Sequence, residues 1–406
     1  MPTALLIGLA AAGGTALATW LACLLDPARA WDFRPVAEDE PPAPAPPAWP
    51  RVAVVVPAHD EADVLPRALP ALLAQDYPGA WGVVLVDDRS RDGTGEVARA
   101  LGEAAAAAPG GAAGRLEVLA GAPLPDGWAG KVHAMAQGVE RAATLEPAPA
   151  YVLLTDADIR HAPGSLRALV AEAERDGLAL TSRMARLHCA SAMERLLVPP
   201  FVLFFNLLYP MRRVNDPRSR FYGAAGGCVL VRLDALAAAG GMAAIRGEII
   251  DDVNLARAVQ GQVRRGAPGR PIRLALSRSQ VTSLRAYTTL GPAWRMVRRT
   301  AFTQLRHSWA LLALTVFGLA LLFALPAALV PLGAAVAATG EPAWGTALTV
   351  LGAAGWGATA LVHRPATRFY GLAWWWALTL PVAGVLYGGM TLDSGRRHLL
   401  GHHRAW

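Results

Sequence analysis

RVAVVVPAHDE (51–61), VVLVDDRSRDGT (83–94) and YVLLTDAD (151–158) are the stretches that decide the fold of this chain. Each begins with a short apolar run, and acidic side chains stand at its end or just after it. Short runs that are apolar at successive positions are typical of strands buried on both faces of a parallel sheet. We therefore predict strands at 51–58, at 83–88 and over 151–158.

The segments between these strands have the composition of helices and loops. Alternating strands and helices predict an α/β domain whose mostly parallel sheet is covered on both faces. We place this domain at residues 51–285, with its ligand site beyond the carboxyl ends of the strands. The other elements expected in its first half are a strand at 115–120, helices at 62–75, from about 94 and at 131–143, and an Ala/Gly-rich loop at 104–114.

The N-terminal stretch at residues 4–25 carries no charge and is long enough to cross a bilayer. A signal peptide is the alternative, but no basic side chain precedes the stretch. Arg29 and Arg34 follow it, which favours an anchor at residues 1–25 whose C-terminal side is cytoplasmic. Residues 26–50 are rich in Pro and Ala, and we predict a semi-rigid extended linker there.

The last third of the chain returns to apolar sequence after a basic juxtamembrane segment at 286–308. Its apolar segments predict about three transmembrane helices within 309–391. These segments lie near 309–331, 344–362 and 371–391. An earlier apolar stretch at 196–210 is short and contains two adjacent prolines, so we expect an interfacial or buried element rather than a crossing.

The arginines around the C-terminal segments do not agree on one orientation. Those of the 363–370 loop place it on the cytoplasmic side, whereas three crossings would place the basic tail at 392–406 outside. A half-spanning segment in 309–338, interrupted by Pro326 and Pro331, would remove this conflict. The side of the tail therefore stays open.

The net charge of +7 indicates negatively charged partners. No basic stripe with interleaved aromatic residues resembles a nucleic-acid-binding module. Because the chain has apolar ends, we expect a membrane surface as the partner and no nucleic acid. The three cysteines have no metal-ligand spacing, which agrees with reduced thiols in a cytoplasmic domain.

Two pairs of carboxylates follow predicted strands. Asp156 and Asp158 are two positions apart, a spacing at which oxygen ligands can hold a hard divalent cation that bridges a diphosphate. Asp87 and Asp88 can accept hydrogen bonds from a nucleobase and from ribose hydroxyls. The alternative for the first pair is solubility. The alternative for the second is a turn, with Asp92 or Thr94 as the N-cap of the next helix.

Three further features indicate chemistry. Asp252, next to Asp251 at a predicted helix start, suits a general base that deprotonates an acceptor hydroxyl, although both acids could simply cap the helix. Gly226 and Gly227 permit a close backbone approach to a ligand, or form an ordinary turn. Lys131 is the only lysine among 38 basic residues, and a compact ammonium differs from a guanidinium in a tight site.

Arg295, Arg298 and Arg299 are spaced so that one helical face would present all three. Arginines arranged in this way can clamp a diphosphate bidentately. A cytoplasmic basic flank of a membrane segment is the alternative.

These motifs occur in a fixed order across about 51–300. They are VVVPAHDE (54–61), VDDRSRDGT (86–94), AGKVHAMAQG (129–138), TDAD (155–158), GG (226–227), DDVNL (251–255) and RMVRR (295–299). Together they resemble the family 2 glycosyltransferases. Within that family, RLHCASAMERLLVPPFVLFFNLLYPMRRVNDP (186–217) is similar to the hopene-associated glycosyltransferases of hopanoid-making bacteria.

The resemblance implies a GT-A fold, a nucleotide-sugar donor, an inverting single displacement and a divalent cation, Mg or Mn, on Asp156 and Asp158. It implies that Asp252 is the base. The nucleotide-sugar site that we expect consists of Glu61, Asp87, Asp88, Lys131, Asp156, Arg295 and Arg298. The chain departs from the family pattern at Asp60, Ala136, Asp251 and Arg299, where Asn, Asn, Glu and Trp are usual.

We therefore expect an inverting glycosyltransferase in the bacterial cytoplasmic membrane, multi-pass, with its catalytic domain in the cytoplasm. By resemblance, its acceptor is a lipid, a hopanoid or a related isoprenoid. The alternatives are an enzyme that makes a polyprenyl-phosphate sugar and a non-catalytic membrane scaffold with a transferase-like domain.

Overall fold

The structure, a computed structural model, describes residues 2–108, 114–267, 269 and 271–400 of the 406-residue chain. The chain divides into two compact units, each assembled from segments that are far apart in sequence. The sheet unit lies within residues 34–188 and 211–286. The helical unit lies within residues 2–33, 189–210 and 287–400.

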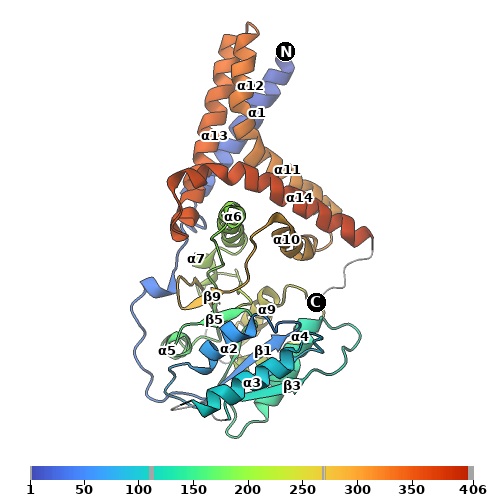
Figure 1. The fold of residues 1–406 in the computed structure, drawn as a ribbon. Coiled ribbons are helices and arrows are strands. Elements are labelled where there is room, and N and C mark those ends of the chain that lie inside the picture. Colours follow the sequence, from blue (N-terminus) through green and yellow to red (C-terminus); the bar gives the residue numbers. More distant parts are fainter. Residues whose placement is uncertain (1, 109–113, 268, 270, 401–406) are drawn as a thin grey trace. The chain divides into compact units, whose positions relative to one another are not determined.

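The sheet unit is built on a seven-stranded sheet with the order β3-β2-β1-β4-β7-β6-β8. Figure 1 labels β1 and β3 of this sheet. Among its described strands, only β7 runs antiparallel to its neighbours, which confirms the mostly parallel sheet. The strands are β1 (Val52–Ala58), β2 (Trp81–Asp87), β3 (Leu116–Ala120), β4 (Tyr151–Leu154), β6 (Leu180–Met184), β7 (Val229–Arg232) and β8 (Arg273–Leu276). A separate ribbon pairs β5 (Ile159–His161) with β9 (Val281–Ser283).

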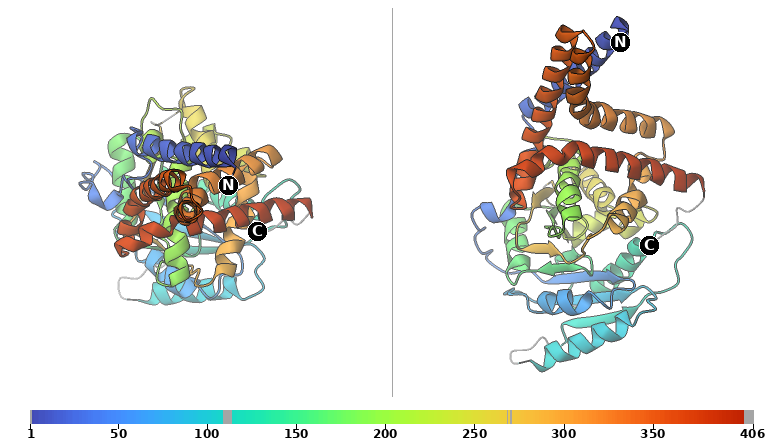
Figure 2. Two further views of the ribbon diagram at one scale, coloured as in Figure 1. Left: turned by 90° about the horizontal axis from the view of Figure 1, so that it is seen from above. Right: turned by 45° about the horizontal axis from the view of Figure 1, so that its top comes forward.

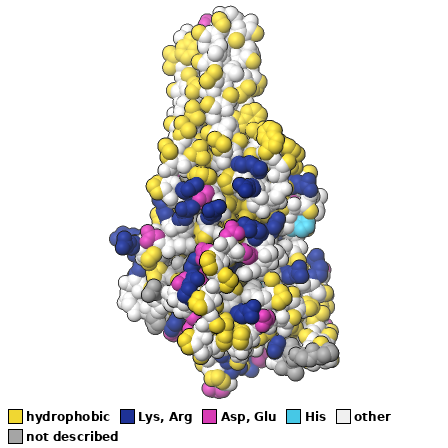
Figure 3. Space-filling model, turned by 90° about the vertical axis from the view of Figure 1, so that its left-hand side faces the viewer, with side chains coloured by type: hydrophobic (Ala, Val, Ile, Leu, Met, Phe, Trp, Pro, Cys, Tyr) yellow, Lys and Arg dark blue, Asp and Glu magenta, His cyan; other side chains and the backbone are white. Residues whose placement is uncertain are grey.

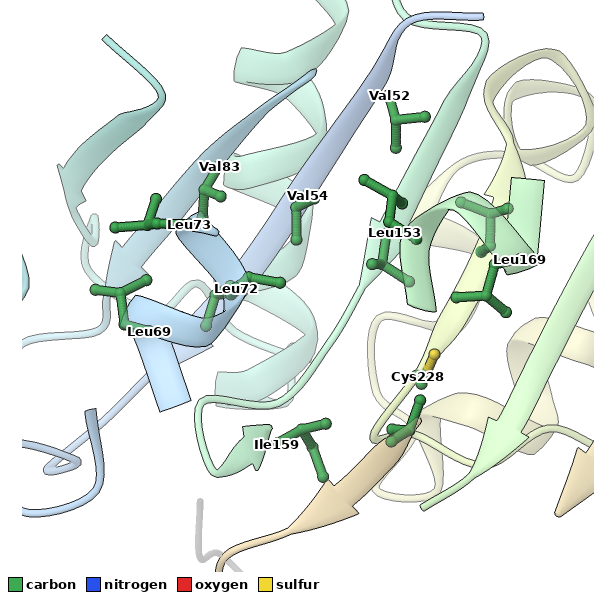
Figure 4. Packing of buried hydrophobic residues seen from close by; sticks show 14 of the residues in the cluster. Val52, Val54, Leu69, Leu72, Leu73, Val83, Leu153, Ile159, Leu169 and Cys228 are labelled. Atoms are coloured by element: carbon green, nitrogen blue, oxygen red, sulfur yellow. The ribbon is translucent and has the colours of Figure 1, made fainter. Parts of the chain in front are cut away.

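Helices cover both faces of this sheet because the strands present apolar side chains alternately to each face. On one face Val54 and Leu153 pack among leucines of α2 and α5 (Figure 4). On the other face Val86 packs with Ala134 of α4. The helices of this unit are α2 (Leu65–Leu73), α3 (Thr94–Ala107), α4 (Gly130–Ala143), α5 (Ser165–Asp176), α7 (Met211–Val214), α8 (Leu233–Ala238) and α9 (Asp251–Val263), with 3₁₀ turns at Ala37–Asp39 and Met242–Ile245.

The predicted elements differ from the observed ones mainly at their ends. Helix α3 continues through Ala107 into the segment expected to be a loop, since its alanines are strong helix formers. The rest of that predicted loop includes residues 109–113, which lie outside the described residues. Strand β4 ends at Leu154, so the acids predicted within a strand lie in the turn that follows it.

The segment expected to be a linker contacts the sheet unit along part of its length. Val36 forms a parallel bridge with Leu276. Glu38 Oε1 accepts hydrogen bonds from the backbone N–H groups of three consecutive residues that start at Arg278, each at 2.8 or 2.9 Å. Arg273 pairs with Glu40. This part of the segment is therefore an extra edge of the domain rather than a free spacer.

Five stretches of the described residues are long and apolar enough to cross a membrane by length and composition. Four lie in the helical unit, and the fifth extends from it into α7 of the sheet unit. They are Thr3–Leu25, Ala192–Val214, Trp309–Ala338, Pro342–Phe369 and Trp374–Leu399. The helices are α1 (Thr3–Leu25), α6 (Ala192–Leu208), α10 (Leu290–Gln304), α11 (Trp309–Leu319), α12 (Leu325–Ala338), α13 (Pro342–Phe369) and α14 (Leu380–Leu399).

Proline does not interrupt these helices as the sequence suggested. The two prolines expected to break the 196–210 stretch lie inside α6. Pro326 lies in the first turn of α12 and Pro331 inside it, and α11 joins α12 through a π-helical turn at Ala320–Ala324. The chain bends at this turn (Figure 2). A proline lacks an N–H and removes one helical hydrogen bond, which a continuous helix tolerates by bending.

Helices α1, α12 and α13 pack closely through small residues. A Cβ on Gly333 would lie 2.6 Å from the carbonyl oxygen of Gly345, and a Cβ on Gly13 would lie 2.7 Å from a methyl of Leu329. On the face seen in Figure 3, the end formed by these helices shows hydrophobic side chains and no Lys or Arg. Helix α14 runs across the α12–α13 pair rather than along it (Figures 1 and 2).

Candidate active site

The loops that follow β1 and β2 are joined at the carboxyl edge of the sheet. The backbone N–H of Asp60 donates to Ser90 Oγ at 3.0 Å, and the N–H of Glu61 donates to Thr94 Oγ1 at 2.8 Å. Asp60 adopts a positive φ of 55°, which Asn and Asp tolerate better than other residues. These bonds fix the position of Glu61 relative to the loop that contains the second acid pair.

The two acids of that pair have different surroundings. The Asp88 side chain is buried, and its Oδ1 is 3.1 Å from Arg89 Nε. Asp87 Oδ1 accepts the backbone N–H of Ser90 at 3.1 Å. The turn of the alternative is therefore present at Asp87, but helix α3 has Gly93 at its N-cap and no side chain caps it. Asp88 is a buried carboxylate at the strand end. The role of both in binding a nucleotide stays a prediction.

Asp156 and Asp158 lie in the turn after β4, and each carboxylate faces its own cation. Asp156 Oδ1 is 2.7 Å from Lys131 Nζ. Asp158 Oδ2 is 3.0 Å from Arg285 Nε and 3.4 Å from Ser283 Oγ. Burial raises the pKa of Asp156, and the neighbouring Asp158 adds to this effect, while Lys131 opposes it.

Lys131 is the second residue of α4, and its ammonium lies between two acids. Besides Asp156, its Nζ is 3.2 Å from Asp251 Oδ2. Burial disfavours the charged ammonium, but these carboxylates outweigh that effect and raise the pKa of Lys131 above its usual value. The lone lysine therefore joins the turn after β4 to the start of α9.

Asp252 stands in the first turn of α9 with its carboxylate held by backbone donors. Its Oδ2 accepts the N–H of Gly226 and its Oδ1 accepts the N–H of Val253, each at 2.7 Å. Burial and the adjacent charge of Asp251 raise the pKa of Asp252 to about 7, against the opposing effect of Lys131 and these hydrogen bonds. A carboxylate with this pKa can accept a proton near neutral pH.

Gly226 and Gly227 have no side chains, and this leaves space for the neighbouring side chains. A Cβ on Gly226 would lie 3.3 Å from Lys131 Nζ and 3.4 Å from Asp252 Oδ2. A Cβ on Gly227 would lie 2.9 Å from the Ile159 side chain. The close backbone approach predicted from the sequence is therefore toward the chain's own lysine and acid.

The acid pair after β4 fits a divalent cation in part. Contacts among the described residues engage Oδ1 of Asp156 and Oδ2 of Asp158, which leaves one oxygen of each for a hard cation. No group of three or more His, Cys, Asp or Glu side chains with a metal-site arrangement occurs among the described residues. The two carboxylates would therefore need phosphate oxygens or water to complete a coordination shell.

Arg285 is a site residue that no sequence motif indicated. Its guanidinium contacts both Asp158 and Glu61. Burial raises the pKa of Glu61, with Arg285 opposing and Asp158 adding to the increase. Because the chain contains many arginines, the sequence around Arg285 does not mark it as a site residue. The pairing of β5 with β9 brings it to the two acids.

Arg295 and Arg298 belong to α10 of the helical unit. Arg298 Nη1 is 3.2 Å from Asp393 Oδ2, an oxygen that also accepts the indole N–H of Trp294 at 2.8 Å. Arg295 is exposed. Their proposed contact with the diphosphate stays a prediction.

Residues 53–239 match the family model described as glycosyl transferase family 2. Among solved structures, the mannosyltransferase PcManGT from Pyrobaculum calidifontis, in complex with GDP-Man and Mn2+, has 21% identity and a TM-score of 0.53 over 86% of this chain and 96% of its own. Glucosyl-3-phosphoglycerate synthase of M. tuberculosis has 18% identity and a TM-score of 0.38 over 63% and 80%. No curated protein sequence matches the chain.

Proposed function

We propose that this glycosyltransferase moves a sugar from a nucleotide-sugar to a lipid acceptor by a single inverting displacement. The starting point is the match of residues 53–239 to the glycosyl transferase family 2 model, on a GT-A α/β fold. The observation that carries the proposal is the ammonium of Lys131 between Asp156 and Asp251, beside Asp252. One side of this cluster suits a diphosphate, and the other suits a hydroxyl that must lose a proton.

In this mechanism Asp252 is the general base. Its carboxylate takes the proton of the acceptor hydroxyl as the oxygen forms a bond to the anomeric carbon. The bond between that carbon and the diphosphate breaks, and the nucleoside diphosphate leaves. The N–H groups of Gly226 and Val253 hold the carboxylate in one orientation, so that its position is fixed before the acceptor arrives.

The donor side is assigned to the residues at the strand ends. Glu61, Asp87 and Asp88 bind the nucleoside, and Lys131 binds along the donor. Asp156 and Asp158 would hold Mg or Mn, and the bound ion would supply positive charge to neutralise the leaving diphosphate. Arg295 and Arg298 belong to this assignment through the family resemblance alone.

The acceptor is a lipid, and the resemblance of residues 186–217 favours a hopanoid or related isoprenoid. The support is that the chain devotes a whole unit to apolar helices, which a water-soluble acceptor would not require. The enzyme then works at the bacterial cytoplasmic membrane with its catalytic domain in the cytoplasm, as the arginines after the first helix favour.

We place the C-terminal tail on the cytoplasmic side as well. The support is the pairing of α14 with α10 through Asp393 and Ser394, whose Oγ donates to the Arg298 carbonyl at 2.6 Å. Because α10 carries three arginines and follows the catalytic domain directly, it cannot lie in the hydrocarbon core. Helix α14 then lies along the membrane surface, and the conflict in the charge pattern disappears.

Donor hydrolysis and transfer by the purified full-length protein test the proposal. Release of nucleoside diphosphate from UDP- or GDP-sugars, stimulated by an extract of isoprenoid lipids, is the expected result. A folded protein that neither binds nor cleaves any donor would indicate the scaffold alternative. Stimulation by polyprenyl phosphate rather than by hopanoid would identify the other acceptor class, and the lipids of a deletion strain would show the missing product.

A further inference from the structure

Arg285 holds together two acids that come from different strand ends. Its Nε lies 3.0 Å from Asp158 Oδ2, and its Nη2 contacts Glu61 Oε1. Glu61 follows β1 and Asp158 follows β4, which are adjacent parallel strands. Without a cation between them, two partly buried carboxylates this close would repel each other.

The backbone fixes where this arginine stands. It follows β9, in which Ser283 pairs with Ile159 of β5. The N–H of Leu284 donates to the carbonyl oxygen of Asp158 at 2.9 Å. These backbone hydrogen bonds attach the Arg285 main chain to the turn that carries Asp156 and Asp158. Only the side chain of Arg285 is free to change partners.

The arginine is much more open than the acids it contacts. Its side chain is 47% exposed, whereas those of Asp158 and Glu61 are 12% and 13% exposed. Among the described residues, none forms a hydrogen bond or an ion pair with its Nη1. A half-exposed guanidinium with one nitrogen open to a further partner can form a bidentate pair with a phosphate.

We propose that Arg285 binds the donor's phosphate and competes with the divalent cation for Asp158. The inference rests on the proposed function and extends it to a residue outside the matched family segment. Before a donor binds, Arg285 pairs with Asp158 and Glu61. A divalent cation on the open Oδ1 of Asp158 would repel the guanidinium on Oδ2. The guanidinium would then turn to the donor's phosphate.

The test measures two affinities that should move in opposite directions in Arg285→Gln. Mn2+ binding to the full-length protein without nucleotide is followed by the electron paramagnetic resonance signal of free Mn2+. Loss of the competing guanidinium should tighten it about two- to fivefold, the range of a solvent-exposed ion pair. Binding of GDP and UDP with saturating Mn2+ should weaken about tenfold through loss of a charged hydrogen-bond pair.

Arg278→Gln is the matched control. Arg278 is 45% exposed and pairs with Asp39. The Arg278→Gln variant therefore loses the same charge at a similar exposure, away from Asp158 and Glu61. It should leave both affinities unchanged. Arg285→Lys keeps the charge but cannot reach both acids, and should fall between wild type and Arg285→Gln in Mn2+ affinity.

The outcomes separate this inference from the function on which it rests. If wild type binds Mn2+ and a nucleotide but Arg285→Gln matches Arg278→Gln, Arg285 has a structural role and the inference fails alone. If neither wild type nor Arg285→Gln binds Mn2+ while both melt cooperatively, Asp158 is not a cation site, and the inference fails together with the cation of the proposed function.

Discussion

Lys131 Nζ lies 2.7 Å from Asp156 Oδ1 and 3.2 Å from Asp251 Oδ2, and it thereby joins the turn after β4 to the start of helix α9. A Cβ on Gly226 would lie only 3.3 Å from the same ammonium. The space around it is therefore limited on a third side. These two ion pairs connect Asp156 and Asp251, which the sequence placed in separate motifs.

Lys131→Arg should impair the enzyme although it keeps the charge. A planar guanidinium is wider than an ammonium and would displace Asp156 or Asp251 from its position. A displacement of about 1 Å in an active site can cost roughly 10²-fold in rate, and we expect a loss of that order in kcat/KM. Arg141→Lys on the same helix, where the side chain pairs with Glu117 near the surface, is the control and should be nearly neutral. Wild-type turnover in Lys131→Arg would show that the lysine is not required.

Asp252→Asn should abolish transfer while donor binding survives. Removing a general base typically lowers the rate about 10²- to 10⁴-fold. The amide keeps the shape of the side chain, so the measurement is turnover alongside the affinity for a nucleoside diphosphate. Asp251→Asn is the comparison, because that acid pairs with Lys131. A larger loss of turnover in Asp251→Asn than in Asp252→Asn would reassign the base.

The rate should fall on the acid side of neutral pH. The pKa of Asp252 is raised to about 7, so its carboxyl gains a proton, and can no longer act as a base, as the pH falls through that value. We expect kcat/KM to be flat above about pH 8 and to fall tenfold per pH unit below about pH 6.

A substitution of Lys131 tests the same pH dependence. Its positive charge lowers the pKa of Asp252, so Lys131→Met should move the acid limb to higher pH. Arg141→Met removes a positive charge from the same helix without touching these acids and should leave the limb in place. An acid limb near pH 4 in wild type would show that the base is an unshifted carboxylate elsewhere.

Activity should require a divalent ion, and Asp158→Ala should lose both the activity and its response to the ion. A bound cation supplies about 3 kcal/mol or more of charge stabilisation, roughly 10²-fold in rate. The measurement is donor cleavage in chelator, followed by titration with Mg2+ and Mn2+. Full activity in excess chelator would exclude the metal from the reaction.

The tail after α14 should lie on the same side of the membrane as the catalytic domain. With the three native cysteines replaced by Ser, single cysteines at Gly340 and Leu400 report the turn after α12 and the end of α14. In spheroplasts a membrane-impermeant maleimide should label Gly340→Cys, but Leu400→Cys only after lysis. Ser90→Cys is the control for the catalytic domain. Labelling of Leu400→Cys in intact spheroplasts would mean that α14 crosses the bilayer.

The sequence by itself determined the α/β domain and its mostly parallel sheet, because short apolar runs such as Val52–Ala58 alternate with helical segments along the chain. It also placed the carboxylates at the edge of the sheet, since acids that follow parallel strands must share that edge. It could not set the ends of elements like α3, whose alanines favour a helix where a loop was expected.

Only the tertiary structure decided which groups meet. Arg285 reaches Asp158 and Glu61 because β9 pairs with β5, a contact between segments about 120 residues apart that no local pattern encodes. Lys131 reaches Asp251 for the same kind of reason. The helices containing Pro199 and Pro326 also stay continuous, since neighbouring helices supply packing that local propensity does not include. Composition and spacing determine which residues can do chemistry, and long-range packing determines which of them act together.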